Sequence, residues 1–219
     1  MDAGPAGNGL DLLNHSDFFM SRIKSPFFWF ILSLLTTAGL TAVGPEEASL
    51  GANIRIIYLH GAWELTSEIT LVLSAVAGLL GILFRREKLH DGSSALGKTG
   101  VFFWVTSLPL SLWAMQSNWN GLFLVEPRFR VAVVFSVVGI LLQTGMSLIS
   151  NRVFNSLLNI LYVIALRIGL SRAVYVMHPP PSPIFKSGIL SLQLFFAGVI
   201  FLTFCAAYFM TRWWLQKHK

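Results

Sequence analysis

The chain has 219 residues, of which 54% are hydrophobic and 12% are charged, and its formal net charge is +6. A soluble domain carries about 25% charged residues, so this composition excludes an ordinary soluble fold and predicts a surface that faces lipid. The positive charge does not indicate a nucleic-acid partner, because the basic residues cluster at the ends of apolar stretches, as they do in membrane proteins.

Residues 1–24 are polar and lack the basic start of a signal peptide, so we expect a solvated N-terminal tail. Six apolar stretches follow, and each predicts a transmembrane helix: residues 26–43, 56–84, 100–115, 131–149, 153–177 and 189–210. Pro109 lies inside the third stretch, where a membrane helix tolerates it. The single cysteine, Cys205, excludes an internal disulfide. The predicted fold class is all-α: residues 25–219 form one polytopic membrane bundle of six transmembrane helices.

The basic residues also predict an orientation. If both termini are cytoplasmic, most of the Lys and Arg residues that flank the six stretches lie on the cytoplasmic side, as the positive-inside rule requires. The outer face then carries loops 44–58, 116–130 and 178–188. His15, His90 and His218 fall on the cytoplasmic side, where we expect ordinary solvated histidines.

Two histidines, His60 and His178, lie at the outer loops, on either side of an aromatic loop that contains arginines. Iron porphyrin needs these residue types. Its iron takes two axial imidazoles, its apolar ring packs on aromatic surface, and its propionates pair with arginine. Arg55, Arg128 and Arg130 are placed for the propionates. The plainer alternative is that the arginines are interface anchors and the aromatic residues form the interfacial belt.

Three stretches carry a resemblance to a known family. Residues 55–63, RIIYLHGAW, are similar to a R-I-x-Y-x-H-x-P-x-A-W motif, shortened between the histidine and the tryptophan. Residues 119–128, WNGLFLVEPR, are similar to a W-G-x-W-W-x-W-D-x-R motif of which only the first tryptophan, Trp119, is kept. His178 and the prolines after it are similar to a second histidine in an L-H-Q-P context. Together these stretches resemble the CcmC-type, or cytochrome c assembly, family of heme-handling membrane proteins.

The resemblance implies heme b held at the outer face, with His60 and His178 as the metal ligands. Trp119, Phe123, Glu126 and Arg128 then hold or present the porphyrin, and the implied cofactor-binding set also includes Arg55, Trp63 and Arg130. The implied function is non-enzymatic, because two histidines fill both axial positions and disfavour oxygen chemistry. The implied partners are a heme chaperone or an apocytochrome c, the lipid bilayer, and ABC-transporter-type or other membrane subunits. The implied location is a bacterial or organellar inner membrane.

Two other classes of function stay open. One alternative hypothesis is that the chain is a degenerate family member that serves as a structural subunit of a larger membrane complex without heme, because most tryptophans of the motif are replaced. An enzymatic reading uses the spacing of His60, Glu64 and Glu68, which share one helical face and could bind zinc.

Arg167 and Arg172 interrupt the fifth stretch, and ionisable groups within a membrane helix are costly unless they are paired. Glu64 and Glu68 are the only acidic residues inside a predicted span. We therefore expect charge pairs between the second and fifth spans, with the alternative that Arg172 extends outward to the membrane surface.

Overall fold

The computed structural model describes residues 25–149, 151–173 and 183–217. Within these ranges the chain forms seven α-helices, which confirms the all-α fold class. The helices are α2 (Pro26–Ala42), α3 (Ile54–Phe84), α4 (Glu87–Trp119), α5 (Pro127–Leu148), α6 (Arg152–Ser171), α7 (Pro183–Lys186) and α8 (Leu190–Lys217).

Local sequence signals set several helix ends. Proline occupies the first turn of α2 and of α5, where its missing N–H has no helical partner to lose. The side chain of Asn151 caps α6 by accepting a hydrogen bond from the N–H of Phe154 at 3.0 Å. Arg85 adopts a left-handed conformation with φ of 50° and turns the chain from α3 into α4.

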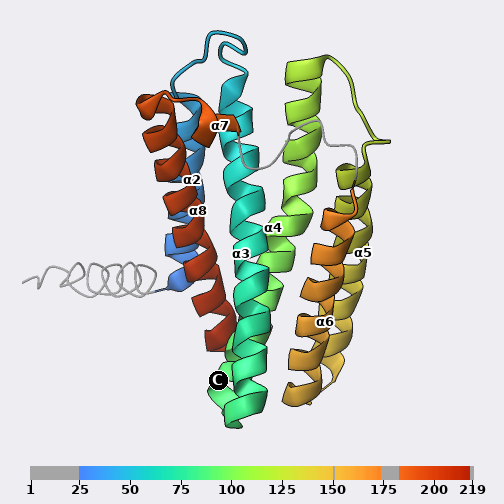
Figure 1. The fold of residues 1–219 in the computed structure, drawn as a ribbon. Helices are drawn as coiled ribbons and strands as arrows, with labels where there is room; N and C mark the ends of the chain where they lie inside the picture. Colours follow the sequence, from blue (N-terminus) through green and yellow to red (C-terminus); the bar gives the residue numbers. More distant parts are fainter. Residues whose placement is uncertain (1–24, 150, 174–182, 218–219) are drawn as a thin grey trace, which may run out of the picture.

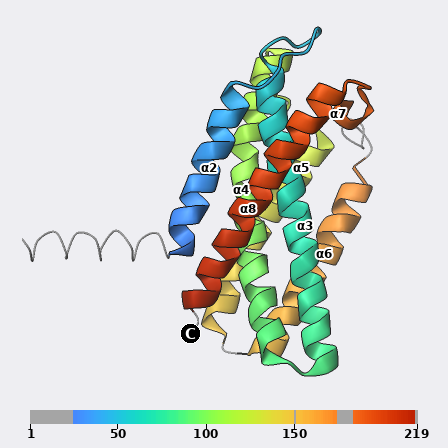
Figure 2. The same cartoon turned by 90° about the vertical axis from the view of Figure 1, so that its left-hand side faces the viewer.

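The six long helices run alternately in opposite directions (Figure 1). In both views the start of α2 and the end of α8 lie close together (Figures 1 and 2). We call the end of the bundle with the α3–α4 and α5–α6 turns and the two described chain ends the turn end. The α2–α3 and α4–α5 connections and α7 lie at the opposite end, which we call the loop end (Figure 1).

Among the described helices, four are long and apolar enough to cross a membrane, namely α3, α5, α6 and α8. This finding is consistent with a multi-pass membrane protein. Helix α2 is also apolar but has only 17 residues. Helix α4 has 33 residues but begins with the polar segment 87–99.

The bounds of several elements differ from those expected. Helix α4 begins at Glu87 rather than near residue 100, so the prediction of its start was wrong. The predicted outer loops 44–58 and 116–130 are longer than the connections in the structure, which within these loops are residues 44–53 and 120–126. Helix α6 ends at Ser171, and most of the predicted remainder of the fifth span lies outside the described residues, as do the tail 1–24 and part of loop 178–188.

The expectation that His90 is solvated was also wrong. Its side chain is 5% exposed, and Nδ1 lies 2.7 Å from the hydroxyl oxygen of Ser156 on α6. The cause is the early start of α4, which places His90 between α3 and α6. A Cβ added at Gly81 on α3 would come within 2.9 Å of the imidazole, so the glycine makes room for it.

Candidate functional site

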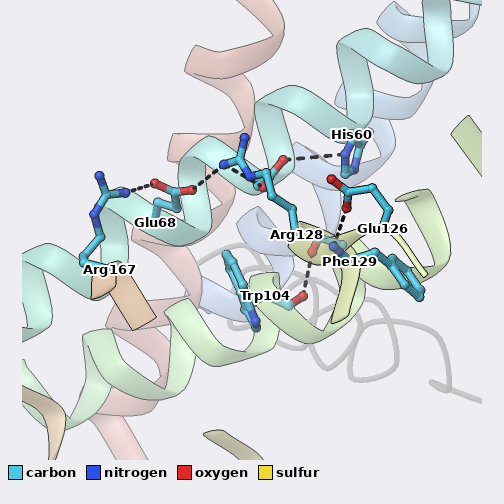
Figure 3. A network of polar contacts seen from close by, with 9 residues as sticks. His60, Glu68, Trp104, Glu126, Arg128, Phe129 and Arg167 are labelled. Carbon is cyan, nitrogen blue, oxygen red and sulfur yellow. Dashed lines mark hydrogen bonds and ion pairs between the residues drawn. The ribbon is translucent and has the colours of Figure 1, made fainter. Parts of the chain in front are cut away.

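One face of α3 carries the ionisable residues of the site. His60, Glu64 and Glu68 follow one another at helical spacing on this face. Glu68 points toward Arg128 of α5 and Arg167 of α6 (Figure 3). The Nε2 atom of His60 lies 3.6 Å from Oε2 of Glu64. The two groups are therefore close but beyond a normal hydrogen-bond distance.

The first turn of α5 places Arg128 opposite this face. Glu126 precedes Pro127 and caps the helix, its carboxylate accepting a hydrogen bond from the N–H of Phe129 at 2.6 Å. Arg128 then reaches α3, where its Nη2 atom lies 3.9 Å from one carboxylate oxygen of Glu64 and 3.9 Å from one of Glu68 (Figure 3). Arg128 thus bridges the two carboxylates, a contact that the sequence did not predict.

Helix α6 completes the charge network. The Nη1 atom of Arg167 donates a hydrogen bond to Oε2 of Glu68 at 2.5 Å (Figure 3). The expected charge pair between the second and fifth spans is confirmed at these residues. Arg172 follows the last helical turn and is exposed, and no ion pair between described residues includes it.

An open pocket lies beside this network, between α3, α4 and α5. Its narrow interior has a volume of about 100 Å³, and the space including its open mouth is about 690 Å³. Trp104 fixes its wall, because the indole N–H donates to the carbonyl oxygen of Ala132 on α5 at 3.1 Å. The lining residues are His60, Glu64, Trp104, Ser107, Leu108, Ser111, Ala114, Met115, Trp119, Glu126, Arg128, Phe129 and Ala132.

Two buried polar atoms of the pocket residues lack a hydrogen-bond partner among the described residues. They are Nδ1 of His60 and Oε1 of Glu126. A buried polar group without a partner costs free energy, so these two atoms indicate a place for water or a ligand. The narrow interior is large enough for a few water molecules, since one water molecule occupies about 30 Å³ in the liquid.

Four of the predicted site residues meet at this pocket: His60, Trp119, Glu126 and Arg128. His178, the predicted second ligand, lies outside the described residues. Sequence reasoning missed the walls of the pocket, which come from Trp104, Phe129 and Met115. Trp104 and Met115 lie within an apolar helix, where nothing in the sequence separates a pocket residue from a packing residue.

The other four predicted residues lie elsewhere. Arg55 binds the α2–α3 connection, with Nε donating to the carbonyl oxygen of Gly44 at 3.0 Å and Nη2 lying 3.1 Å from Glu46. Trp63 packs against α4: its ring centroid lies 4.8 Å from that of Phe103 and its N–H donates to Thr106. Phe123 and Arg130 are exposed and do not line the pocket.

The described residues contain no group of three or more His, Cys, Asp or Glu side chains arranged to hold a metal ion. A zinc site on His60 and Glu64 would therefore need a further ligand from outside the described ranges.

Comparison of the chain with protein-family models, with curated proteins and with solved structures finds no match. The described residues form an all-α bundle, and its long apolar helices are consistent with a multi-pass membrane protein. The resemblance to the CcmC-type family rests on the three stretches around His60, Trp119 and His178 alone.

Proposed function

We propose that this protein is a non-enzymatic membrane protein that binds heme at the loop end of the bundle and passes it to a heme chaperone or an apocytochrome c. The observation that best supports the proposal is His60, which keeps a buried ring nitrogen without a partner beside an open pocket lined by Trp104, Trp119 and Phe129. A neutral imidazole nitrogen is a metal ligand, and aromatic walls suit a flat apolar ring.

The dimensions of the pocket limit how heme would fit. The interior of about 100 Å³ is smaller than the about 300–1,000 Å³ of typical ligand sites and too small for a porphyrin, so heme would have to lie in the open mouth of the pocket. Among the described residues of the lining, Arg128 is the one cation for a propionate, and Glu64 and Glu126 are carboxylates. These carboxylates favour a positively charged iron centre and oppose a buried propionate, so we expect the propionates to face water.

The described part of α7 supports a second ligand from the segment that contains His178. Ile184 is 6% exposed and packs in one apolar cluster with Ile54 and Tyr58 of α3, which lie six and two residues before His60 in the sequence. The chain between His178 and Ile184 spans at most about 20 Å. The proposal of His178 as the second ligand is compatible with this length of chain.

We further propose six transmembrane spans with both termini in the cytoplasm. A hydrocarbon core about 30 Å thick needs about 17–25 helical residues, which α2 meets with 17 and α4 exceeds with 33. The basic residues around the α3–α4 and α5–α6 turns favour a cytoplasmic location for the turn end. The His60 pocket would then face the opposite side of the membrane.

The second candidate function is that of a structural subunit without heme. The charge network favours it, because Arg128 and Arg167 already neutralise Glu64 and Glu68 within the bundle. In this reading the network holds α3, α5 and α6 together and the pocket holds water.

Hemin titration of the purified protein separates the two candidates. Bound heme should quench the fluorescence of Trp119, and His60→Ala should weaken binding by at least about tenfold, as loss of a metal-site group does. Leu124→Ala is the matched control, because Leu124 is 52% exposed in the α4–α5 connection and lies outside both the pocket and the predicted heme-binding set. Equal affinity in wild type and His60→Ala would contradict the heme proposal, and absence of binding with a partner co-purified at fixed stoichiometry would support the structural candidate.

A further inference from the structure

A second open groove lies on another side of α4, along the middle of the helix. Helices α5 and α8 each pack against α4, but within the described residues they do not contact one another, and the groove runs between them. Its volume is about 500 Å³. We call it the α5–α8 groove, and its lining is Lys98, Val101, Phe102, Val105, Thr106, Ile140, Gln143, Thr144, Ser147 and Trp214.

The groove changes from polar to apolar along its length. Ser147 lies one residue before the end of α5 and Trp214 lies in the last turn of α8, so this end of the groove is at the turn end of the bundle. Lys98 belongs to this polar end, with its ammonium nitrogen 5.2 Å from the ring centroid of Trp214. Farther along α4 and α5 the lining is apolar apart from Thr106, and is formed by Val101, Phe102, Val105 and Ile140.

Two buried groups of the lining have no hydrogen-bond partner among the described residues. Gln143 is 9% exposed, and its Nε2 donates to Oδ1 of Asn159 at 3.0 Å, but its Oε1 accepts no bond. The indole N–H of Trp214 is buried and has no acceptor. The groove therefore offers a cation, an unused N–H donor and an unused oxygen acceptor next to an apolar channel.

We propose that the α5–α8 groove binds an anionic glycerophospholipid with a hydroxylated headgroup, such as phosphatidylglycerol. Lys98 and the N–H of Trp214 would bind the phosphate, and Oε1 of Gln143 would accept a hydrogen bond from a headgroup hydroxyl. One acyl chain would lie along Val101, Val105 and Ile140. Basic pockets between transmembrane helices bind anionic headgroups in this way, and tryptophan is typical of the interfacial level.

The order of groups along the groove favours a lipid over a partner helix as the occupant. The polar end lies at the turn end of the bundle, where a headgroup would sit at the membrane interface, and the apolar part continues from it as an acyl chain does. The proposal stands on the turn end of the bundle and does not depend on heme binding at the loop end.

Native mass spectrometry of the full-length protein in detergent tests the proposal, with phosphatidylglycerol and phosphatidylcholine as the two probes. Wild type should retain phosphatidylglycerol in preference to phosphatidylcholine, and Lys98→Gln should weaken its retention by about fivefold, the contribution of one lysine beside an anionic lipid. Lys88→Gln is the matched control, because Lys88 is exposed at the same end and lies outside the groove. Ile140→Trp should reduce the retention of both lipids by filling the apolar part, and Ile140 is 47% exposed, so the change leaves the packed core alone.

Equal retention of the two lipids by wild type would overturn the proposal. So would Lys98→Gln protein that holds phosphatidylglycerol as well as the Lys88→Gln control does. A third contrary result would be a disulfide-linked dimer of the Ile140→Cys, Cys205→Ser protein formed in place of lipid retention, since a second copy would then occupy the groove.

Discussion

Glu68 joins three helices of the bundle through its carboxylate. One oxygen accepts a hydrogen bond from Arg167 on α6, and the other lies 3.9 Å from Arg128 on α5. Its side chain is 19% exposed, whereas Arg167 is 58% exposed. The carboxylate is therefore the less accessible partner of this pair. Loss of the Glu68 carboxylate would leave the charged Arg167 facing lipid without this partner.

A double-mutant cycle at Glu68 and Arg167 should show a coupling free energy of about 1–2 kcal/mol, near the upper end of polar interactions measured between membrane helices. Glu68→Gln and Arg167→Gln, alone and together, would be compared by reversible unfolding in detergent. The control is the pair of Glu87 and Arg152, whose nitrogen and oxygen lie 2.8 Å apart but whose side chains are 79% and 50% exposed. Exposed pairs couple by about 0–1 kcal/mol, so equal coupling in the two pairs would contradict the assignment.

At the scale of the element, α3 and α4 form the tightest helix pair of the bundle. Small residues of one helix meet the backbone or side chains of the other: the hydroxyl of Ser67 donates to the carbonyl oxygen of Gly100 at 2.8 Å, and that of Ser74 donates to the carbonyl oxygen of Ser93 at 2.8 Å. Such small residues let two helix backbones approach closely in a membrane. The close approach positions Trp104, which forms a wall of the His60 pocket.

Gly100→Ala should destabilise the bundle by about 1–3 kcal/mol, the usual cost of overpacking. The new Cβ would lie 2.6 Å from Cγ of Leu71 and 3.1 Å from its backbone nitrogen, and the backbone cannot move aside. Gly92→Ala on the same helix has no atom within 4 Å of its Cβ and should be neutral or slightly stabilising. The free energies of unfolding of the two variants would decide the point, and a similar loss in both would show that helix propensity rather than contact with α3 governs α4.

At the scale of the whole molecule, the turn end and the loop end should lie on opposite sides of the membrane. The chain has one cysteine, Cys205, so a Cys205→Ser protein provides a background for single reporter cysteines. Ala48 in the α2–α3 connection and Lys88 beside the α3–α4 turn are both exposed and mark the two ends.

A membrane-impermeant maleimide should label Ala48→Cys protein in intact cells and Lys88→Cys protein only after the membrane is opened. The reason is the surplus of basic residues at the turn end, which by the positive-inside rule should keep this end in the cytoplasm. Labelling of only the Lys88→Cys protein in intact cells would indicate the opposite orientation. Labelling of both proteins in intact cells would contradict the placement of the two ends on opposite sides of the membrane.

The sequence predicts those features that depend on composition along the chain. The apolar stretches predicted the positions of most of the long helices. The presence of Glu68 and Arg167 inside apolar stretches predicted that these two residues pair. It could not predict the burial of His90 or the early start of α4, because residues 87–99 read as a polar loop until α3 and α6 are packed around them. The bridging position of Arg128 depends on the cap at Glu126, whose effect on neighbouring helices is a property of the packed bundle.

The visible absorption spectrum of the protein purified from heme-replete cells tests the central claim, that the His60 pocket binds heme. The account predicts the bands of a low-spin heme in wild type and their loss in His60→Ala protein of the same helical content. A colourless wild-type protein that also takes up no added heme, or an unchanged spectrum in the His60→Ala protein, would contradict it.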